Sequence, residues 1–373
     1  MKKYLELAKQ IYQTIERFGS TIWSGFESVP FIIYNDEFQI AVGTGFSARY
    51  EQVEANIWIA TGKDEHLFGD TVTEYHGLGV AIWNVDTWPE DVDVATATSC
   101  VYHEMFHAHQ YYKFKPIDNA GGMILDYQHK TASVALTIAE NQYLLDILAN
   151  PSKESVLTNL NQLANLRQAR LAALGQNYLA YDQAEETIEG TAVYAEIKMA
   201  MTISGKSASE CAVDYLQLLR LTDDTLARYR ARLYSVGLIL CLACEYLDLD
   251  LQTEMVQSGK SVFAWLTEKL NLPIATVEPK AFDLNFELAQ QLLSDFTKIK
   301  EEKINAFLAQ PHVEVNGVLN GLDPMNLVVH GNLCLHKRGQ VIIGGVAQQL
   351  QQPYLTEFAD GNVFVAKRMW ISG

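Results

Sequence analysis

The spacing of apolar residues predicts a helix at the start of the chain, followed by short strands. In the first 18 residues the apolar positions fall on one helical face: Leu5, Ala8, Ile11, Tyr12, Ile15 and Phe18. Short runs rich in Ile, Val, Phe and Trp come next, bounded by Gly, Asp or Asn, at residues 30–34, 38–42, 56–60 and 78–83. These runs predict a small twisted sheet.

Helical patterns dominate the middle of the sequence. A helix is expected from about Val94 to Lys113, with Asp91 or Asp93 as its N-cap and Pro116 beyond its end. Residues 126–310 then have a mostly helical pattern. The plausible breaks in it are Pro151-Ser152, Ser204-Gly205 and Leu272-Pro273.

From about His312 the pattern changes to short strands between Gly, Asn and Asp turns. The runs are residues 313–315, 326–329, 332–335, 340–343 and 362–365. They predict a small β module at the C-terminus. The expected fold class is therefore α+β, in three regions: an α+β lobe at 1–120, a helical lobe at 121–310 and the β module at 311–373.

Two histidines on the predicted helix at 94–113 have the spacing of metal ligands. His103 and His107 lie one turn apart on one face, so both imidazoles can reach a single ion. Glu104 lies about 100° further round the helix and can reach a water on that ion. The flanking residues are apolar and small, which marks a buried helix where unpaired histidines would be costly. A zinc site is therefore favoured over a pair of surface histidines, and it needs one more protein ligand.

The residues that follow on the same helix have separate interpretations. His109 falls on the opposite face and is interpreted as a structural or surface histidine. Gln110 and Tyr111 share the face of the site and could hydrogen-bond to the ligands from outside.

The third ligand is expected on another helix, within residues 185–196. For Glu185 and Glu186 a solvated helix face is the favoured interpretation. Glu189 is preferred as the ligand because Gly190 and Ala192 beside it let the histidine helix approach closely. If Glu189 binds the ion, Glu186 is expected to receive the outer N–H of a ligand histidine.

These motifs together resemble the gluzincin metallopeptidases, most closely the membrane-alanyl-aminopeptidase-like group. The residues that carry the resemblance are His103-Glu104-x-x-His107, Glu189-Gly190-x-Ala192-x-Tyr194 and Tyr234-Ser235-Val236-Gly237. The resemblance implies a zincin-like catalytic region, in which a small twisted sheet and an active-site helix precede a helical lobe. It implies that His103, His107 and Glu189 bind Zn²⁺, that Glu104 activates water and that Tyr234 stabilises the oxyanion.

The chain departs from that group where the group grips a free amino terminus, because the Gly-x-Met-Glu-Asn stretch is absent. The strand at 77–83 stands in its expected place, has no carboxylate, and is expected to pair with an extended peptide. The predicted function is a zinc metallopeptidase acting on a peptide or protein. A zinc hydrolase of a non-peptide amide and a non-catalytic interaction protein with the same fold are the alternatives; the intact Glu104 argues against the second.

Charge and composition limit the partners. A net charge of −17 opposes binding to phosphate backbones, so no nucleic-acid partner is expected. No apolar run approaches the roughly 20 residues that span a bilayer, so no membrane segment is expected. Five cysteines without framework spacing suit a reducing compartment, and the predicted location is cytoplasmic. Cys241 and Cys244 are interpreted as core residues on a buried helix.

Overall fold

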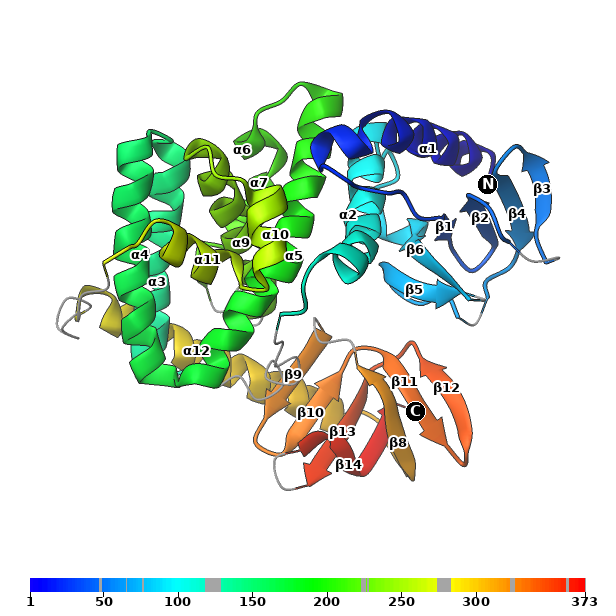
Figure 1. Ribbon diagram of the computed structural model, residues 1–373. Helices are drawn as coiled ribbons and strands as arrows, with labels where there is room; N and C mark the ends of the chain where they lie inside the picture. The colour runs from blue at the N-terminus through cyan, green and yellow to red at the C-terminus, as the bar shows by residue number, and fades with distance from the viewer. Residues whose placement is uncertain are drawn as a thin grey trace. The chain divides into compact units, whose positions relative to one another are not determined.

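The protein is described from a computed structural model of the 373-residue chain (Figure 1). The described residues are 1–46, 49–64, 66–75, 77–117, 129–222, 226, 228–273, 283–322, 326–359 and 362–372. The chain divides into two compact units that each combine separate segments. The first unit contains Met1–Ile117, Glu186–Leu216 and Gly237–Lys269. The second contains Asp118–Glu185, Gln217–Val236 and Leu270–Gly373.

The first unit begins with a helix and a six-stranded sheet. The helix is α1 (Lys2–Ile22), and the strands are β1 (Phe31–Tyr34), β2 (Phe38–Val42), β3 (Glu51–Glu54), β4 (Ile57–Thr61), β5 (Thr71–Tyr75) and β6 (Leu78–Asn84). The strand order is β3-β4-β2-β1-β6-β5. The pair β1–β6 is parallel and the other neighbouring pairs are antiparallel.

The predicted strands are present as β1, β2, β4 and β6, whereas the edge strands β3 and β5 were not predicted. Every residue of β3 is exposed, and β5 buries only Tyr75. A strand at the edge of a sheet can remain polar, so it lacks the apolar run that marks a buried strand. The predicted pairing of the 77–83 strand with a peptide is wrong, because β6 is already paired to β1 on one side and β5 on the other.

The predicted helix at 94–113 is confirmed as α2 (Val94–Lys113). Its N-cap is Asp93, whose carboxylate accepts a hydrogen bond from the Thr96 N–H at 2.7 Å. Helix α2 packs on α1 and on the strands β5 and β6 (Figure 1). This packing buries one face of α2 and fixes the direction in which the opposite face points.

The remaining helices of the first unit include parts of two long ones. They are residues 186–204 of α5 (Gln176–Ser204), α6 (Ala208–Cys211), most of α7 (Val213–Gln217), residues 237–246 of α9 (Tyr229–Tyr246), a π-helical turn at Leu251–Met255, α10 (Val256–Ser258) and α11 (Val262–Lys269). Cys241 and Cys244 are fully buried in α9, which confirms that they are core residues.

Helices α5 and α9 touch through their backbones at two glycines. A Cβ atom on Gly190 would lie 2.3 Å from Gly237 Cα, and one on Gly237 would lie 1.9 Å from the Glu186 carbonyl oxygen. Neither position has room for any side chain. The sequence predicted that Gly190 allows the histidine helix α2 to approach closely. In the structure Gly190 packs against α9 instead.

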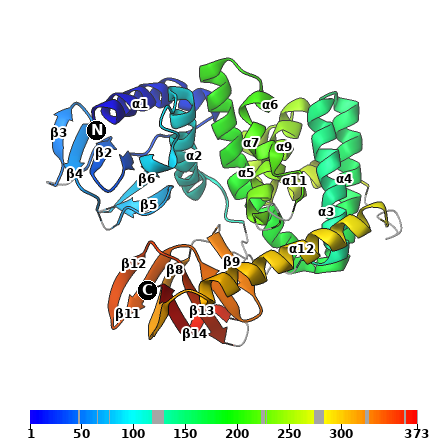
Figure 2. The same cartoon turned by 180° about the vertical axis from the view of Figure 1, so that it is seen from behind.

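The second unit joins a helical group to the C-terminal β strands (Figure 2). Its helices are α3 (Thr131–Ala149), α4 (Lys153–Leu174), residues 176–185 of α5, residues 229–236 of α9, and α12 (Asp283–Leu308). Helix α12 packs on α3 and on the strands β9 (Leu327–His330) and β10 (Leu333–His336). The breaks predicted at 151–152 and 204–205 are confirmed, because α3 ends at Ala149 and α5 ends at Ser204.

The predicted C-terminal β module is confirmed. Its other strands are β7 (His312–Val315), β8 (Gly317–Leu322), β11 (Gly339–Ile343), β12 (Val346–Leu350), β13 (Tyr354–Ala359) and β14 (Asn362–Ser372). They form a five-stranded sheet, β7-β14-β13-β10-β9, and a three-stranded sheet, β12-β11-β8. The fold is thus mixed α+β, as predicted. The predicted boundary at residue 120 lies outside the described residues, and the division into 1–120, 121–310 and 311–373 stays a prediction.

The described part of the chain contains no helix with both the length and the hydropathy required to cross a membrane.

The glycine contact between α5 and α9 predicts that Gly237→Ala destabilises the protein. The new methyl group would overlap the Glu186 carbonyl oxygen, and overpacking of this kind costs about 1–3 kcal/mol or more. The measurement is urea unfolding followed by circular dichroism. Gly321→Ala in β8 is the matched control, because the atoms nearest to its Cβ belong to the flexible Gln340 side chain, at 3.6 Å and beyond. Equal unfolding midpoints for the two variants would contradict the close contact.

Candidate metal centre

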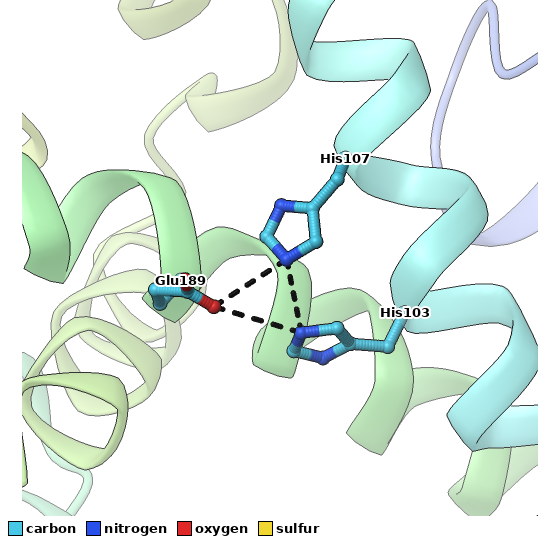
Figure 3. Close-up of side chains that lie close together, drawn as sticks. All are labelled: His103, His107 and Glu189. Carbon is cyan, nitrogen blue, oxygen red and sulfur yellow. Dashed lines mark hydrogen bonds and ion pairs between the residues drawn. The ribbon is translucent and has the colours of Figure 1, made fainter. Parts of the chain in front are cut away.

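Three side chains of the first unit converge between α2 and α5 (Figure 3). The Nε2 atoms of His103 and His107 are 3.1 Å apart. Glu189 Oε2 lies 3.4 Å from the His107 Nε2 and 3.7 Å from the His103 Nε2. The three candidate ligand atoms, one from each residue, thus all lie within 4.8 Å of one another, and together they could hold a metal ion. The structure thus brings together the three residues that the sequence suggested as ligands.

The outer nitrogen of His103 is held by a second carboxylate. His103 Nδ1 lies 2.8 Å from Glu196 Oε2, and the Tyr215 hydroxyl donates a hydrogen bond to the same oxygen at 2.8 Å. A carboxylate accepts the Nδ1–H, so the lone pair of His103 is placed on Nε2, the atom that faces Glu189 and His107.

The outer nitrogen of His107 is held by an amide. His107 Nδ1 lies 2.8 Å from Gln110 Oε1. The Gln110 amide nitrogen donates to the Ile188 carbonyl oxygen at 2.5 Å and to Thr191 Oγ1 at 2.7 Å. Ile188 and Thr191 lie on either side of Glu189 in the sequence. Gln110 therefore fixes the second histidine and the helix segment that carries the carboxylate at the same time.

The prediction that Glu186 accepts the outer N–H of a ligand histidine is wrong. Glu196 accepts it in the structure, from His103 Nδ1. Seen along the helix axis, the position of Glu196 is rotated by about 20° from that of Glu189. The position of Glu186 is rotated by about 60°, toward the side of the helix that carries Gly190. The backbone of Glu186 accordingly contacts α9 at Gly237. The spacing of seven residues between Glu189 and Glu196 was the signal that could have identified Glu196.

Two further expectations about the acidic segment are corrected. Glu185 and Glu186 are both buried rather than solvated. In the second unit Glu185 accepts hydrogen bonds from the Arg230 guanidinium, with Oε2 at 3.0 Å from Nε. Charged residues become buried when an opposite charge satisfies them, and the sequence gives no sign that Arg230 is the partner.

The other residues near the histidine motif are also placed. Gln110 is in the predicted position, but Tyr111 is 83% exposed and does not contact a ligand histidine through any described hydrogen bond. His109 is buried, and its ring lies 5.7 Å from Phe26 and 5.5 Å from Phe106 between ring centroids. His109 is therefore a structural residue of the core, and burial lowers its pKa to about 4.

Ionisation within the site follows from burial and from the carboxylates. Burial lowers the pKa of His103, but hydrogen bonds with Glu189 and Glu196 outweigh it and raise that pKa well above its ordinary value. Burial lowers the pKa of His107 as well, but the negative charge of Glu189 outweighs burial and raises that pKa above its ordinary value. Since only neutral imidazole binds a metal, an incoming cation has to displace protons here.

Glu104 is a buried carboxyl group beside this cluster on α2. Burial raises its pKa, and the charges of His103 and His107 oppose the shift without cancelling it. A carboxyl group with a raised pKa can both accept and release a proton nearer to neutral pH, which is what a general acid–base residue requires.

An open cleft of about 710 Å³ lies beside His107. It is lined by residues of β5, by the two glycines Gly77 and Gly79, by the end of α2 and the segment after it, and by Ile188 of α5. A molecule in this cleft reaches the side of the cluster formed by His107.

Tyr234 belongs to the second unit. There Arg230 Nη1 donates a hydrogen bond to its hydroxyl oxygen at 2.9 Å. Its role as an oxyanion donor stays a prediction that rests on the resemblance.

Comparison with known protein families, with curated proteins and with solved structures finds no match. The interpretation of the site therefore depends on its own geometry and chemistry.

The hydrogen bonds around the cluster predict a graded loss of metal affinity. We expect Glu189→Ala to abolish zinc binding, because a ligand is removed. Glu196→Ala should weaken binding by about 10- to 100-fold, because the Nδ1–H of His103 loses its acceptor. Affinity is measured by competition with a zinc-binding dye, with circular dichroism to verify folding.

Glu186→Gln serves as the matched control on the same helix and should leave zinc affinity unchanged. A larger loss from Glu186→Gln than from Glu196→Ala would show that the wrong carboxylate has been assigned.

Proposed function

We propose that the protein is a zinc-dependent metallopeptidase. The observation that carries the proposal is the convergence of two imidazole nitrogens and one carboxylate oxygen next to a buried glutamate on the same helix. An open cleft beside the cluster supports an enzymatic role, because a purely structural zinc site is closed by four protein ligands.

The donor set fits zinc. Imidazole nitrogen and carboxylate oxygen are ligands that zinc accepts, and three protein ligands are the number found in catalytic zinc sites. Both histidines also have an acceptor for their outer N–H, as ligating histidines almost always do. These residues would hold the ion as His103, His107 and Glu189.

The chemistry of hydrolysis divides between the ion and the chain. Bound zinc would lower the pKa of a water molecule and polarise the scissile carbonyl. Glu104 accepts the proton of the attacking water and delivers it to the leaving amine. Burial raises the pKa of Glu104, which makes its carboxylate a stronger base toward the attacking water. Glu196 and Gln110 keep the two histidines in the tautomer that binds through Nε2.

The free edge of the sheet offers a way to hold a peptide. Within the described residues, β5 pairs only with β6, so its other edge has backbone N–H and C=O groups available. Residues Val72, Thr73 and Glu74 of β5 line the cleft that His107 also lines. An extended peptide that pairs with β5 would therefore run past the metal ligands. We accordingly infer a peptide or protein substrate, a zincin-like catalytic region and, from the free cysteines, a cytoplasmic location.

Digestion of a mixed peptide library, read by mass spectrometry, tests the proposal. Cleavage should occur with the zinc-loaded protein, stop with a chelator and return on addition of zinc. The same products show whether cleavage is internal or terminal. If the peptides stay intact while non-peptide amides are hydrolysed, the protein is a hydrolase of another class. If neither kind of substrate is hydrolysed, the proposal is wrong.

Glu104→Gln should abolish hydrolysis and leave zinc bound. Glutamine keeps the shape of the side chain but cannot accept the proton of water. Turnover on a cleaved peptide and zinc content by elemental analysis are measured on the same sample. If the variant keeps most of its turnover, the base is another group.

Tyr234→Phe should lower turnover by roughly 10²-fold or more with little change in folding, which is the scale for loss of one oxyanion donor. The alternative is a tyrosine with a structural role, whose hydroxyl accepts the hydrogen bond from Arg230. Steady-state kinetics with kcat determined separately from KM distinguish the two, since unchanged kcat would remove Tyr234 from the mechanism.

A further inference from the structure

The cleft beside His107 has an aromatic wall that no described part of the chain covers. Tyr111 and Tyr112, at the end of α2, are 83% and 67% exposed. Their ring centroids are 5.2 Å apart, and both rings line the cleft. Single exposed apolar residues are common on proteins, but adjacent large rings in a concave site indicate binding.

Two glycines add backbone without side chains to the lining of the cleft. They are Gly77, just before β6, and Gly79, within it. A Cβ atom on Gly79 would be in ordinary contact with the Tyr112 hydroxyl, at 3.5 Å, and one on Gly77 would meet no atom of the described residues within 4 Å. The backbone of this segment and Tyr112 therefore lie next to each other in the lining, and neither glycine fills part of the cleft with a side chain.

The remaining lining residues favour an apolar group. Val72 of β5 and Ile188 of α5 add aliphatic side chains to the two tyrosines. The charged side chains at the cleft besides the ligand His107 are Glu74 and Lys115, which are exposed and of opposite sign. Their opposite charges give little preference for a charged group of either sign.

We propose that this cleft binds a bulky apolar side chain, aromatic or branched aliphatic, of the substrate residue next to the scissile bond. The proposal rests on the metallopeptidase function proposed above. His107 connects the two, because it is a member of the metal cluster and a lining residue of the cleft. A side chain seated against Tyr112 is thus attached to a backbone that lies beside the metal. The cleft volume of about 710 Å³ is within the range of sites for small ligands.

Two probes that differ only in the side chain test this proposal. They are dipeptide hydroxamates, one with a benzyl and one with a methyl group, titrated calorimetrically into the zinc-loaded full-length protein. The hydroxamate binds zinc in both cases, so the methyl compound reports the metal site alone. Burying the benzyl group should make its Kd at least about 10-fold lower than that of the methyl compound.

Variants of the cleft should remove this difference without affecting the methyl compound. Tyr112→Ala removes one ring of the wall, and Gly79→Val adds an isopropyl group at a lining position next to Tyr112. Each should bring the two Kd values within about 3-fold of each other. Phe286→Ala, an exposed aromatic residue of α12 outside the cleft, is the matched control and should keep the full preference.

The outcomes separate the two proposals. Equal Kd values for the two hydroxamates on the unaltered protein would overturn the side-chain preference and leave the metallopeptidase proposal standing. A preference that survives both Tyr112→Ala and Gly79→Val would place the benzyl group elsewhere and also overturn it. Binding of neither compound would overturn the metal function, and the side-chain proposal with it.

Discussion

The contact of α5 with α9 at Gly190 and Gly237 sets the direction of the side chains that form the site. With one side of α5 pressed against α9, the positions about 100° further round are turned toward α2. Glu189 and Glu196 occupy those positions, two turns apart, and meet the histidines there. A Cβ atom at either glycine would separate the helices and rotate or displace this row of carboxylates, so the geometry of the His103–His107–Glu189 cluster depends on two residues that do not touch it.

The cluster is held in place from outside as well as from within. Glu196 and Tyr215 fix one histidine, and Gln110 fixes the other while it binds the backbone around Glu189. These hydrogen bonds restrict the rotation of both imidazoles and of the helix segment that carries Glu189. The relative positions of the three side chains thus depend on the packing of α2 against α5 and on residues outside the cluster.

The parts of the site that sequence could predict are those determined within one element. His103 and His107 are neighbours because of helical spacing, and α2 itself was predicted with its bounds. The partners of these histidines depend on how α5 rotates against α2, which tertiary packing decides. Glu196 was missed for that reason, although its spacing from Glu189 held the information. Tyr215 comes from a short helix with no recognisable pattern, and β5 is too polar to be recognised as a strand without its neighbours.

The edge of β5 that no described strand covers has a consequence for the behaviour of the protein in concentrated solution. A strand whose backbone groups are free to pair with a peptide is equally free to pair with the same strand of another molecule, which begins an aggregate. The strand is only five residues long and exposes the carboxylate Glu74, so two copies that approach edge to edge bring like charges together. The overall charge of −17 adds repulsion between molecules at longer range. Salt screens that repulsion, so the tendency to self-associate should rise with ionic strength.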